Sequence, residues 1–348
     1  MNGFGTALAE MIGGSFLQDA ALFMLQNIPG FPPIIQTVHI LGIAVVMGSV
    51  VLINLRLLGL AIPSQGVAEL TGRVMPWFWW ALASNVFSGA FFVLGRPSRY
   101  FNNPVFAWKM GFLLLAVLLA LFFYLKHRQH ANYWEDPARK WTRRGIALLS
   151  LAAWIMVSTA GRWIAYLEYI QYPLWGFEIF DAGPQPSFLM AVENWGLSQI
   201  IAATNWFPLI ETVHVIAVTL VLGSILWVDL RLLGLAARQY PFSVLERELI
   251  PWTWGAFVVA TITGIAMFIT RAASHMENPA FQWKLFLLAL AGINMLIFQR
   301  RVYRPNKMAT ESWDHTEVPP GKIRIFGAAS LVIWSGVMLA GRWIGHIV

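Results

Sequence analysis

The sequence predicts an all-α integral membrane protein, with eight transmembrane helices arranged as two parallel four-helix repeats and amphipathic helices at the membrane interface. Of the 348 residues, 58% are hydrophobic and 12% are charged, whereas soluble domains have about 45–50% apolar and about 25% charged residues. Apolar runs of about 20 residues, long enough to cross a bilayer as a helix, recur along the chain. They do not alternate in polarity, so transmembrane β-strands are not predicted.

Four motifs occur twice and in the same order. They are Thr-Val-His at 37–39 and 212–214, Leu-Arg-Leu-Leu-Gly-Leu-Ala at 55–61 and 230–236, Asn-Pro followed by Trp-Lys at 103–109 and 278–284, and Ala-Gly-Arg-Trp-Ile at 160–164 and 340–344. The second copy of the first three lies 175 residues after the first copy, and that of the last lies 180 residues after, since the second long loop has five extra residues. This shared order and spacing predicts a tandem duplication.

The hydrophobic runs place four spans in each copy. We expect them at about 33–60, 76–95, 104–125, 145–167, 208–235, 251–270, 279–299 and 325–346. The predicted parts are an N-terminal interfacial helix in 1–31, the first repeat in 32–167, a linker with a second interfacial helix in 168–207, and the second repeat in 208–348. Because each repeat has an even number of spans, the two repeats enter the membrane from the same side and are parallel.

Basic residues are concentrated on one face of the predicted bundle. The face that carries the Leu-Arg-Leu-Leu-Gly segments and the loops 61–75, 126–144, 236–250 and 300–324 has 17 of the 24 Lys and Arg residues, and the other face has 7. The positive-inside rule makes the first face cytoplasmic. We therefore expect a multi-pass protein of a bacterial inner membrane with both termini in the periplasm. The net charge of +7 reflects this topology and does not indicate nucleic-acid binding.

Composition excludes several kinds of site. The chain has no cysteine, so disulfides, thiolate metal sites, iron–sulfur ligation and thioether-linked haem are absent. Neither a glycine-rich phosphate loop nor a nucleophile elbow is present, so the sequence does not indicate a kinase or a hydrolase.

One histidine lies within the first span of each repeat. His39 follows Pro33 by six residues, which puts it roughly 9 Å into its helix, and His214 has the same depth in the second repeat. An ionisable side chain at such a depth is a candidate functional residue. The alternative is a neutral histidine bonded to a neighbouring carbonyl. Its retention in both copies favours a ligand role.

The last span of each repeat brings Gly-Arg-Trp back to the level of these histidines. Imidazole is an axial ligand of b-type haem, glycine leaves room for the macrocycle, and arginine pairs with a propionate. The predicted haem-binding residues are His39, His214, Gly161, Gly341, Arg162, Arg342, Trp163 and Trp343. Equal depth would let the two histidines share one haem, and two haems would each need a further ligand. Alternatively, the arginines snorkel to the interface and the tryptophans belong to the aromatic belt.

The second repeat has additional groups that could ligate a metal ion. Glu211 precedes His214 by one helical turn, where the first repeat has Gln36. His275 and His346 occupy the places of Tyr100 and Tyr166. Imidazoles with a carboxylate suit zinc, copper or iron, so the predicted metal ligands are His39, His214, Glu211, His275 and His346. Glu211 could instead orient His214.

Each half resembles small four-span bacterial inner-membrane proteins of uncharacterised function. The resemblance rests on the Thr-Val-His start, the Leu-Arg-Leu-Leu-Gly-Leu segment and the Gly-Arg-Trp of the last span, and it covers nearly the whole chain twice. Those proteins are in turn distantly similar to the copper-resistance D family. The resemblance implies copper handling only through that distant link.

Three functions follow from these observations. The first is electron transfer at the outer leaflet by a haem b protein, with a periplasmic redox protein, quinone or further membrane subunits as partners. The second is binding or transport of copper or another divalent metal ion through Glu211 and His214. The third is a non-catalytic scaffold in the lipid bilayer whose histidines are structural.

Overall fold

The computed structural model describes residues 3–130, 132–166, 187–302 and 313–345, and the described part of the chain is helical without β-strands. In the described part of the chain, eight helices are long and apolar enough to cross a membrane, as predicted. In the first half they are α3 (Phe31–Leu58), α4 (Val67–Gly95), α6 (Pro104–Gln129) and α7 (Lys140–Trp163). In the second half they are α10 (Trp206–Leu232), α11 (Phe242–Phe268), α13 (Pro279–Ile297) and α14 (Gly321–Trp343).

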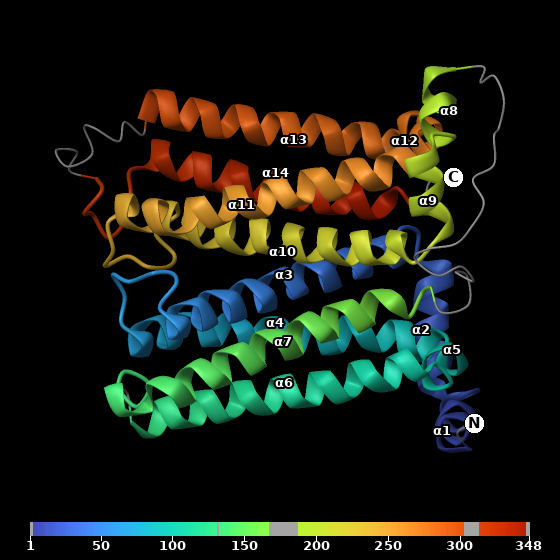
Figure 1. The fold of residues 1–348 in the computed structure, drawn as a ribbon, viewed down its shortest axis with the longest axis horizontal. Coiled ribbons are helices and arrows are strands. Elements are labelled where there is room, and N and C mark those ends of the chain that lie inside the picture. The colour runs from blue at the N-terminus through green and yellow to red at the C-terminus, as the bar shows by residue number, and fades with distance from the viewer. Residues whose placement is uncertain (1–2, 131, 167–186, 303–312, 346–348) are drawn as a thin grey trace.

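The eight helices run side by side, and Figure 1 shows both chain ends at the same end of the bundle. We call this the terminal end, and the opposite end, with the connections 59–66, 130–139, 233–241 and 313–320, the loop end. Short helices lie across the terminal end. They are α1 (Gly3–Ile12), α2 (Phe16–Asn27), α5 (Pro97–Phe101), α8 (Phe188–Glu193), α9 (Gly196–Ala203) and α12 (Ala272–Glu277).

Three details of the predicted helices were wrong. The single interfacial helix expected in 1–31 is two helices at an angle of 73°, because Gly14 has a φ of +70° and Ser15 caps α2. The second interfacial helix, expected in the linker 168–207, is likewise split into α8 and α9. The second spans begin two turns earlier than expected, so Pro76 and Pro251 lie inside α4 and α11.

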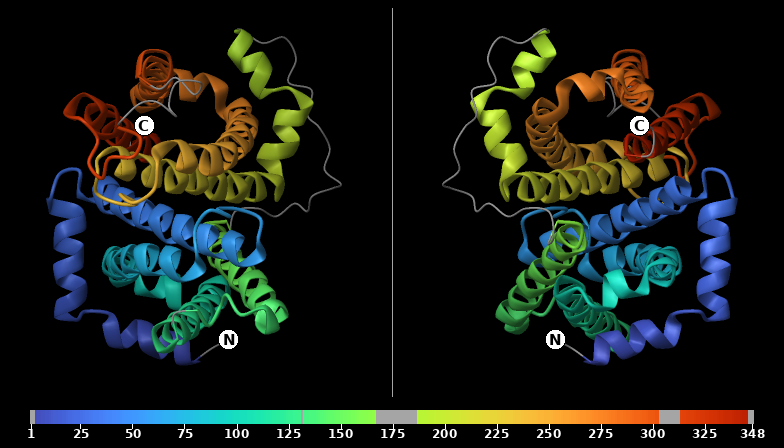
Figure 2. Two further views of the ribbon diagram at one scale, coloured as in Figure 1. Left: turned by 90° about the vertical axis from the view of Figure 1, so that its left-hand side faces the viewer. Right: turned by 90° about the vertical axis from the view of Figure 1, so that its right-hand side faces the viewer.

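The two halves meet along α3 and α10. These helices pack against each other and against α7 and α14, while α4, α6, α11 and α13 lie outside this central group. The end view in Figure 2 shows the two sets of helices on either side of the α3–α10 contact. A Cβ atom built on Gly48 would be 2.7 Å from the Gly223 Cα, and one on Gly223 would be 2.6 Å from the Gly48 Cα. Only glycine at both positions permits this backbone contact.

At the loop end the Leu-Arg-Leu-Leu-Gly-Leu-Ala motif ends the first span of each half. Gly59 and Gly234 have φ values of +78° and +71°, and a left-handed glycine is the usual helix terminator. The motif's arginine then folds back on the loop: Arg56 Nε donates to the Gln65 carbonyl at 2.6 Å, and Arg231 Nε donates to the Tyr240 carbonyl at 2.7 Å. The repetition of this motif therefore has a structural explanation.

Asp229, near the loop end of α10, forms no ion pair with the described residues. It is 4% exposed, its Oδ2 has no hydrogen-bond partner, and its side chain bonds Ser330. In the first half Asn54 Nδ2 donates to Ser150 Oγ at 3.1 Å. An uncharged amide thus satisfies the same position in the other copy.

We predict that Gly48→Ala lowers the free energy of unfolding by about 1–3 kcal/mol, because the added methyl group meets backbone that no rotamer change can move. Thermal unfolding in detergent measures the effect. Gly111→Ala on α6 is the matched control, since no atom lies within 4 Å of its added Cβ. Equal shifts in both variants would contradict the close crossing.

We predict that Asp229→Asn leaves the protein as stable or raises its stability by about 1 kcal/mol, because the amide recreates the Asn54–Ser150 pair and removes an unsatisfied buried carboxyl oxygen. The same unfolding assay measures this. A large loss of stability would show that the carboxyl group itself is required.

Candidate functional site

Both histidines lie between the first and second spans of their own half. His39 Nδ1 is 2.8 Å from Ser88 Oγ on α4, and the Asn85 backbone also bonds the ring. His214 Nδ1 is 2.9 Å from the Ala260 carbonyl oxygen and 3.0 Å from Thr263 Oγ1 on α11. A carbonyl only accepts, so Nδ1 carries the ring proton and Nε2 keeps its lone pair. Within the described part of the chain neither Nε2 forms a hydrogen bond.

A glycine on the second span lets each imidazole approach. A Cβ atom on Gly89 would be 3.3 Å from His39 Cε1, and one on Gly264 would be 3.2 Å from His214 Cε1. The edge of Phe92 also packs on the His39 ring, with 5.5 Å between centroids. The ring orientation is therefore fixed by packing as well as by the Nδ1 hydrogen bond, and this is how proteins hold an imidazole that serves as a ligand.

A lysine of the third span reaches into each half. Lys109 passes Gly161 of α7, where an added Cβ would be 3.4 Å from its Cε and 3.6 Å from its Nζ. Lys284 passes Gly341 of α14 at 3.7 Å from Cε and 3.9 Å from Nζ. The first lysine is the charged group that acts electrostatically on His39, and the second is the one that acts on His214.

Sequence reasoning missed these lysines, because Trp-Lys in the second turn of a membrane helix is typical of an interface anchor. The structure separates the two residues: Trp108 and Trp283 are 66% and 61% exposed, whereas the adjacent lysines are half-buried. The recurrence of Trp-Lys opposite Gly-Arg-Trp was the pattern that could have found them.

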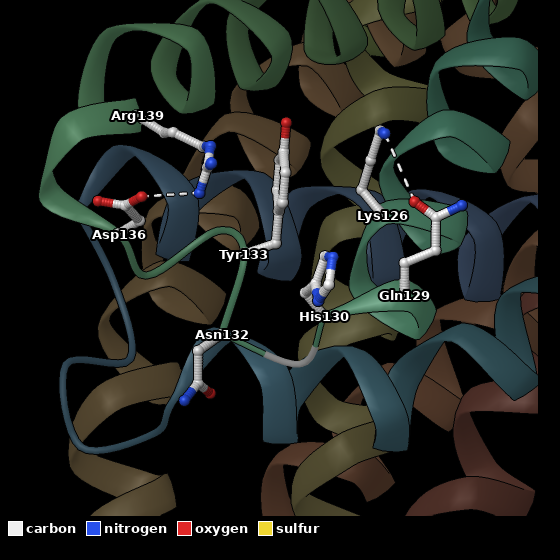
Figure 3. A pocket seen from close by; sticks show the side chains of 7 residues that line it. All are labelled: Lys126, Gln129, His130, Asn132, Tyr133, Asp136 and Arg139. Atoms are coloured by element: carbon white, nitrogen blue, oxygen red, sulfur yellow. Dashed lines mark hydrogen bonds and ion pairs between the residues drawn. The ribbon is translucent and has the colours of Figure 1, made fainter.

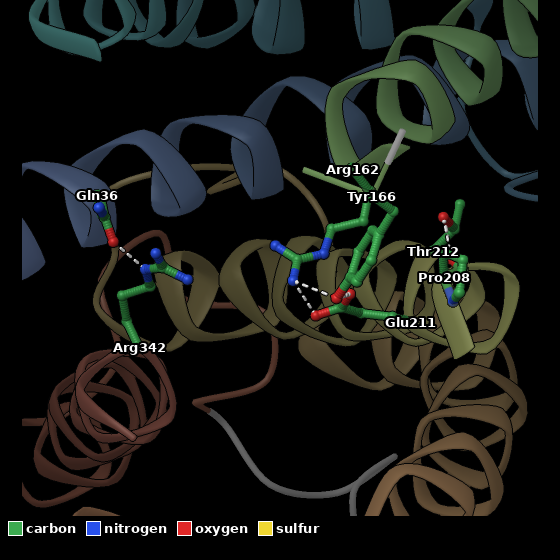
Figure 4. A network of polar contacts seen from close by, with 7 residues as sticks. All are labelled: Gln36, Arg162, Tyr166, Pro208, Glu211, Thr212 and Arg342. Atoms are coloured by element: carbon green, nitrogen blue, oxygen red, sulfur yellow. Dashed lines mark hydrogen bonds and ion pairs between the residues drawn. The ribbon is translucent and has the colours of Figure 1, made fainter. Parts of the chain in front are cut away.

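The arginines of Gly-Arg-Trp reach into the opposite half. Arg162 forms an ion pair with Glu211, and Tyr166 donates a hydrogen bond to the same carboxylate. Burial raises the pKa of the Tyr166 hydroxyl to about 12, so it remains a donor. Arg342 donates to the Gln36 amide oxygen, the counterpart of Glu211 in the first half. Figure 4 shows both contacts along the two central helices.

These cross-half contacts change the predicted grouping of site residues. Each histidine lies with the lysine and the glycines of its own half. Each arginine bonds a residue, Glu211 or Gln36, that lies one helical turn before the histidine of the other half. Trp343 likewise packs near Gly30, where an added Cβ would be 3.7 Å from its Cζ2. The indole nitrogens of Trp163 and Trp343 are buried without hydrogen bonds.

Among the described residues, the predicted metal ligands Glu211, His214 and His275 of the second half do not form a three-residue group. Both carboxylate oxygens of Glu211 bond Arg162 and Tyr166. His275 Nδ1 donates to the Arg271 carbonyl at 2.7 Å and its ring packs on Phe281, and His346 lies outside the described residues. Over the described ranges, no three His, Cys, Asp or Glu residues are arranged to hold a metal ion.

A pocket of about 400 Å³ lies at the loop end, at the opposite end of the bundle from His39 and His214; Figure 3 shows the residues that line it. It is polar and basic, with Arg139 stacked 4.2 Å above the Tyr133 ring and paired with Asp136 at 2.7 Å. The pocket is separate from the candidate site.

Comparison with known families gives one match, to a family of unknown function, DUF6644, over residues 30–167 and again over 201–347. The chain belongs to this family and contains two copies of its unit, which confirms the internal duplication. The matching model is not that of the copper-resistance D family. No curated protein matches the chain.

We predict that Glu211→Gln lowers stability and that Gln36→Glu raises it, each by about 1–2 kcal/mol, because a hydrogen bond between two charged groups is stronger than one with a neutral partner. The two changes are mutual controls at equivalent positions. Thermal unfolding in detergent at low salt measures both. Equal effects of the same sign would contradict the paired cross-half contacts.

Proposed function

We propose that this family member binds one b-type haem in each half, through His39 and His214, and passes electrons at the outer leaflet. The observation that carries the proposal is the pair of oriented imidazoles with free Nε2 atoms. Each has its Nδ1–H fixed by α4 or α11, so Nε2 is presented as an iron ligand. When bound, haem supplies one-electron redox chemistry.

The chain's own residues perform the binding and the orientation. Ser88 and Thr263, with the backbone at Asn85 and Ala260, hold the Nδ1 proton and the ring plane. Gly89 and Gly264 let the imidazole lie against the second span, and Gly161 and Gly341 let the lysine stem lie against the last span. A neutral imidazole with an adjacent cation fits an iron porphyrin with acidic substituents.

Two haems rather than one shared haem are proposed, because the imidazoles face separate helix pairs. His39 bonds α4 and His214 bonds α11, and these two helices lie outside the central group on opposite sides of the α3–α10 contact (Figure 2).

The proposed topology determines which redox partners can reach the histidines. We propose that the terminal end faces the periplasm of a bacterial inner membrane, since the loop end carries most of the basic residues. Both histidines lie in the terminal half of their spans, so a periplasmic donor and either quinone or a further membrane subunit are the partners within reach.

We predict that His39→Ala and His214→Ala each remove about half of the haem per protein and that the double variant removes all of it. The reduced-minus-oxidised visible spectrum of protein purified from haem-replete cells, with haem content per protein, measures this. His275→Ala is the matched control, because this histidine bonds only its own helix end. Unfolding temperatures show whether each variant keeps its fold.

Other outcomes separate the alternatives. Complete loss in either single variant would indicate one shared haem. A wild-type spectrum without b-type bands would refute the proposal, and elemental analysis for copper, zinc and iron would then distinguish metal handling from a scaffold.

A further inference from the structure

Within the described residues, the side chains of Lys109 and Lys284 have no anionic partner. The ion pairs among the described residues are Arg139–Asp136 and Arg162–Glu211, and neither lysine forms a hydrogen bond within the described ranges. Both are half-buried in the terminal halves of α6 and α13. A cation removed from water without a counter-charge is costly, so an unpaired lysine at the same position in both halves requires an explanation.

Simple anchoring at the interface does not account for this geometry. A snorkelling lysine extends along the outside of its helix towards headgroups. Here the exposed tryptophan at 108 or 283 takes the lipid-facing side, and the lysine stem crosses to the glycine of the last span. A Cβ atom added at 161 or 341 would be in van der Waals contact with this stem, at 3.4 Å and 3.7 Å from the lysine Cε. The lysine is therefore directed to the interior of its half, towards the histidine.

The arginines that could have served the same purpose are engaged elsewhere. Arg162 is neutralised by Glu211, and Arg342 bonds Gln36. Both contacts lie on the central helices α3 and α10, whereas each histidine faces the outer helix α4 or α11. The lysine is thus the cation left for a ligand held by the histidine of its own half.

Charge balance indicates what that ligand carries. A ferric porphyrin core has one positive charge, and its two propionates carry two negative charges, so the bound group brings one net negative charge beside a neutral imidazole. One ammonium neutralises it. Building on the proposed haem sites, on which this inference rests, we propose that Lys109 and Lys284 each bind a propionate carboxylate and that neither is an iron ligand.

The test combines a change in the protein with a matching change in the ligand. Haem-free wild-type protein and the Lys109→Met/Lys284→Met variant are titrated in detergent with haemin and with haemin dimethyl ester, whose propionates carry no charge. We expect wild type to bind haemin at least about 10-fold more tightly than the ester. We expect the variant to bind both equally, at about the wild-type affinity for the ester.

Lys126→Met, at the loop end of α6, is the control and retains the wild-type preference for haemin. The visible band positions are compared in all proteins, and they should be unchanged in the double variant. A preference for haemin that persists in the variant, or bands that shift on lysine removal as an iron ligand would require, overturns the assignment while leaving the haem sites intact. If wild type binds neither compound, the haem sites and the lysine assignment both fail. The single variants each abolish the preference at half of the sites.

Discussion

The backbones of α3 and α10 cross where Gly48 meets Gly223, and the arrangement of the two halves depends on this contact. Helix association in membranes gains little from hydrophobicity and relies on close packing, which small residues permit. The crossing brings the last span of each half beside the first span of the other, since α7 also packs against α10 and α14 against α3. A larger residue at the crossing would separate all four central helices together.

In this packing the two faces of each first span make different contacts. The central face carries Gln36 and Glu211, which receive the arginines of the opposite half. The outer face carries His39 and His214, which bond the second span of their own half. The duplication therefore gives two equivalent histidine sites joined by a central interface. The halves differ at that interface, where only the second has a carboxylate, so one contact is an ion pair and the other a neutral hydrogen bond.

The sequence predicted the features that depend on local pattern and composition, namely the eight spans and the duplication. It did not predict which way Arg162 and Arg342 reach, because chain order places each one near the histidine of its own half, whereas the packing of α7 on α10 decides the partner. It also missed the inward direction of Lys109, since α6 is apolar on all sides and no stripe distinguishes its buried face. The second spans were predicted to begin at Pro76 and Pro251, since proline favours the first turn of a helix, whereas α4 and α11 begin before these prolines, at Val67 and Phe242.

The central claim is that each half holds its own haem b. The most direct test is the number of haems per polypeptide in the wild-type protein, from the absorbance of the pyridine haemochrome and the protein mass determined by amino-acid analysis. Two haems per chain would agree with independent His39 and His214 sites on opposite sides of the α3–α10 crossing. One haem per chain in fully loaded protein would contradict the equivalence of the halves, and none would contradict the assignment of these histidines as iron ligands.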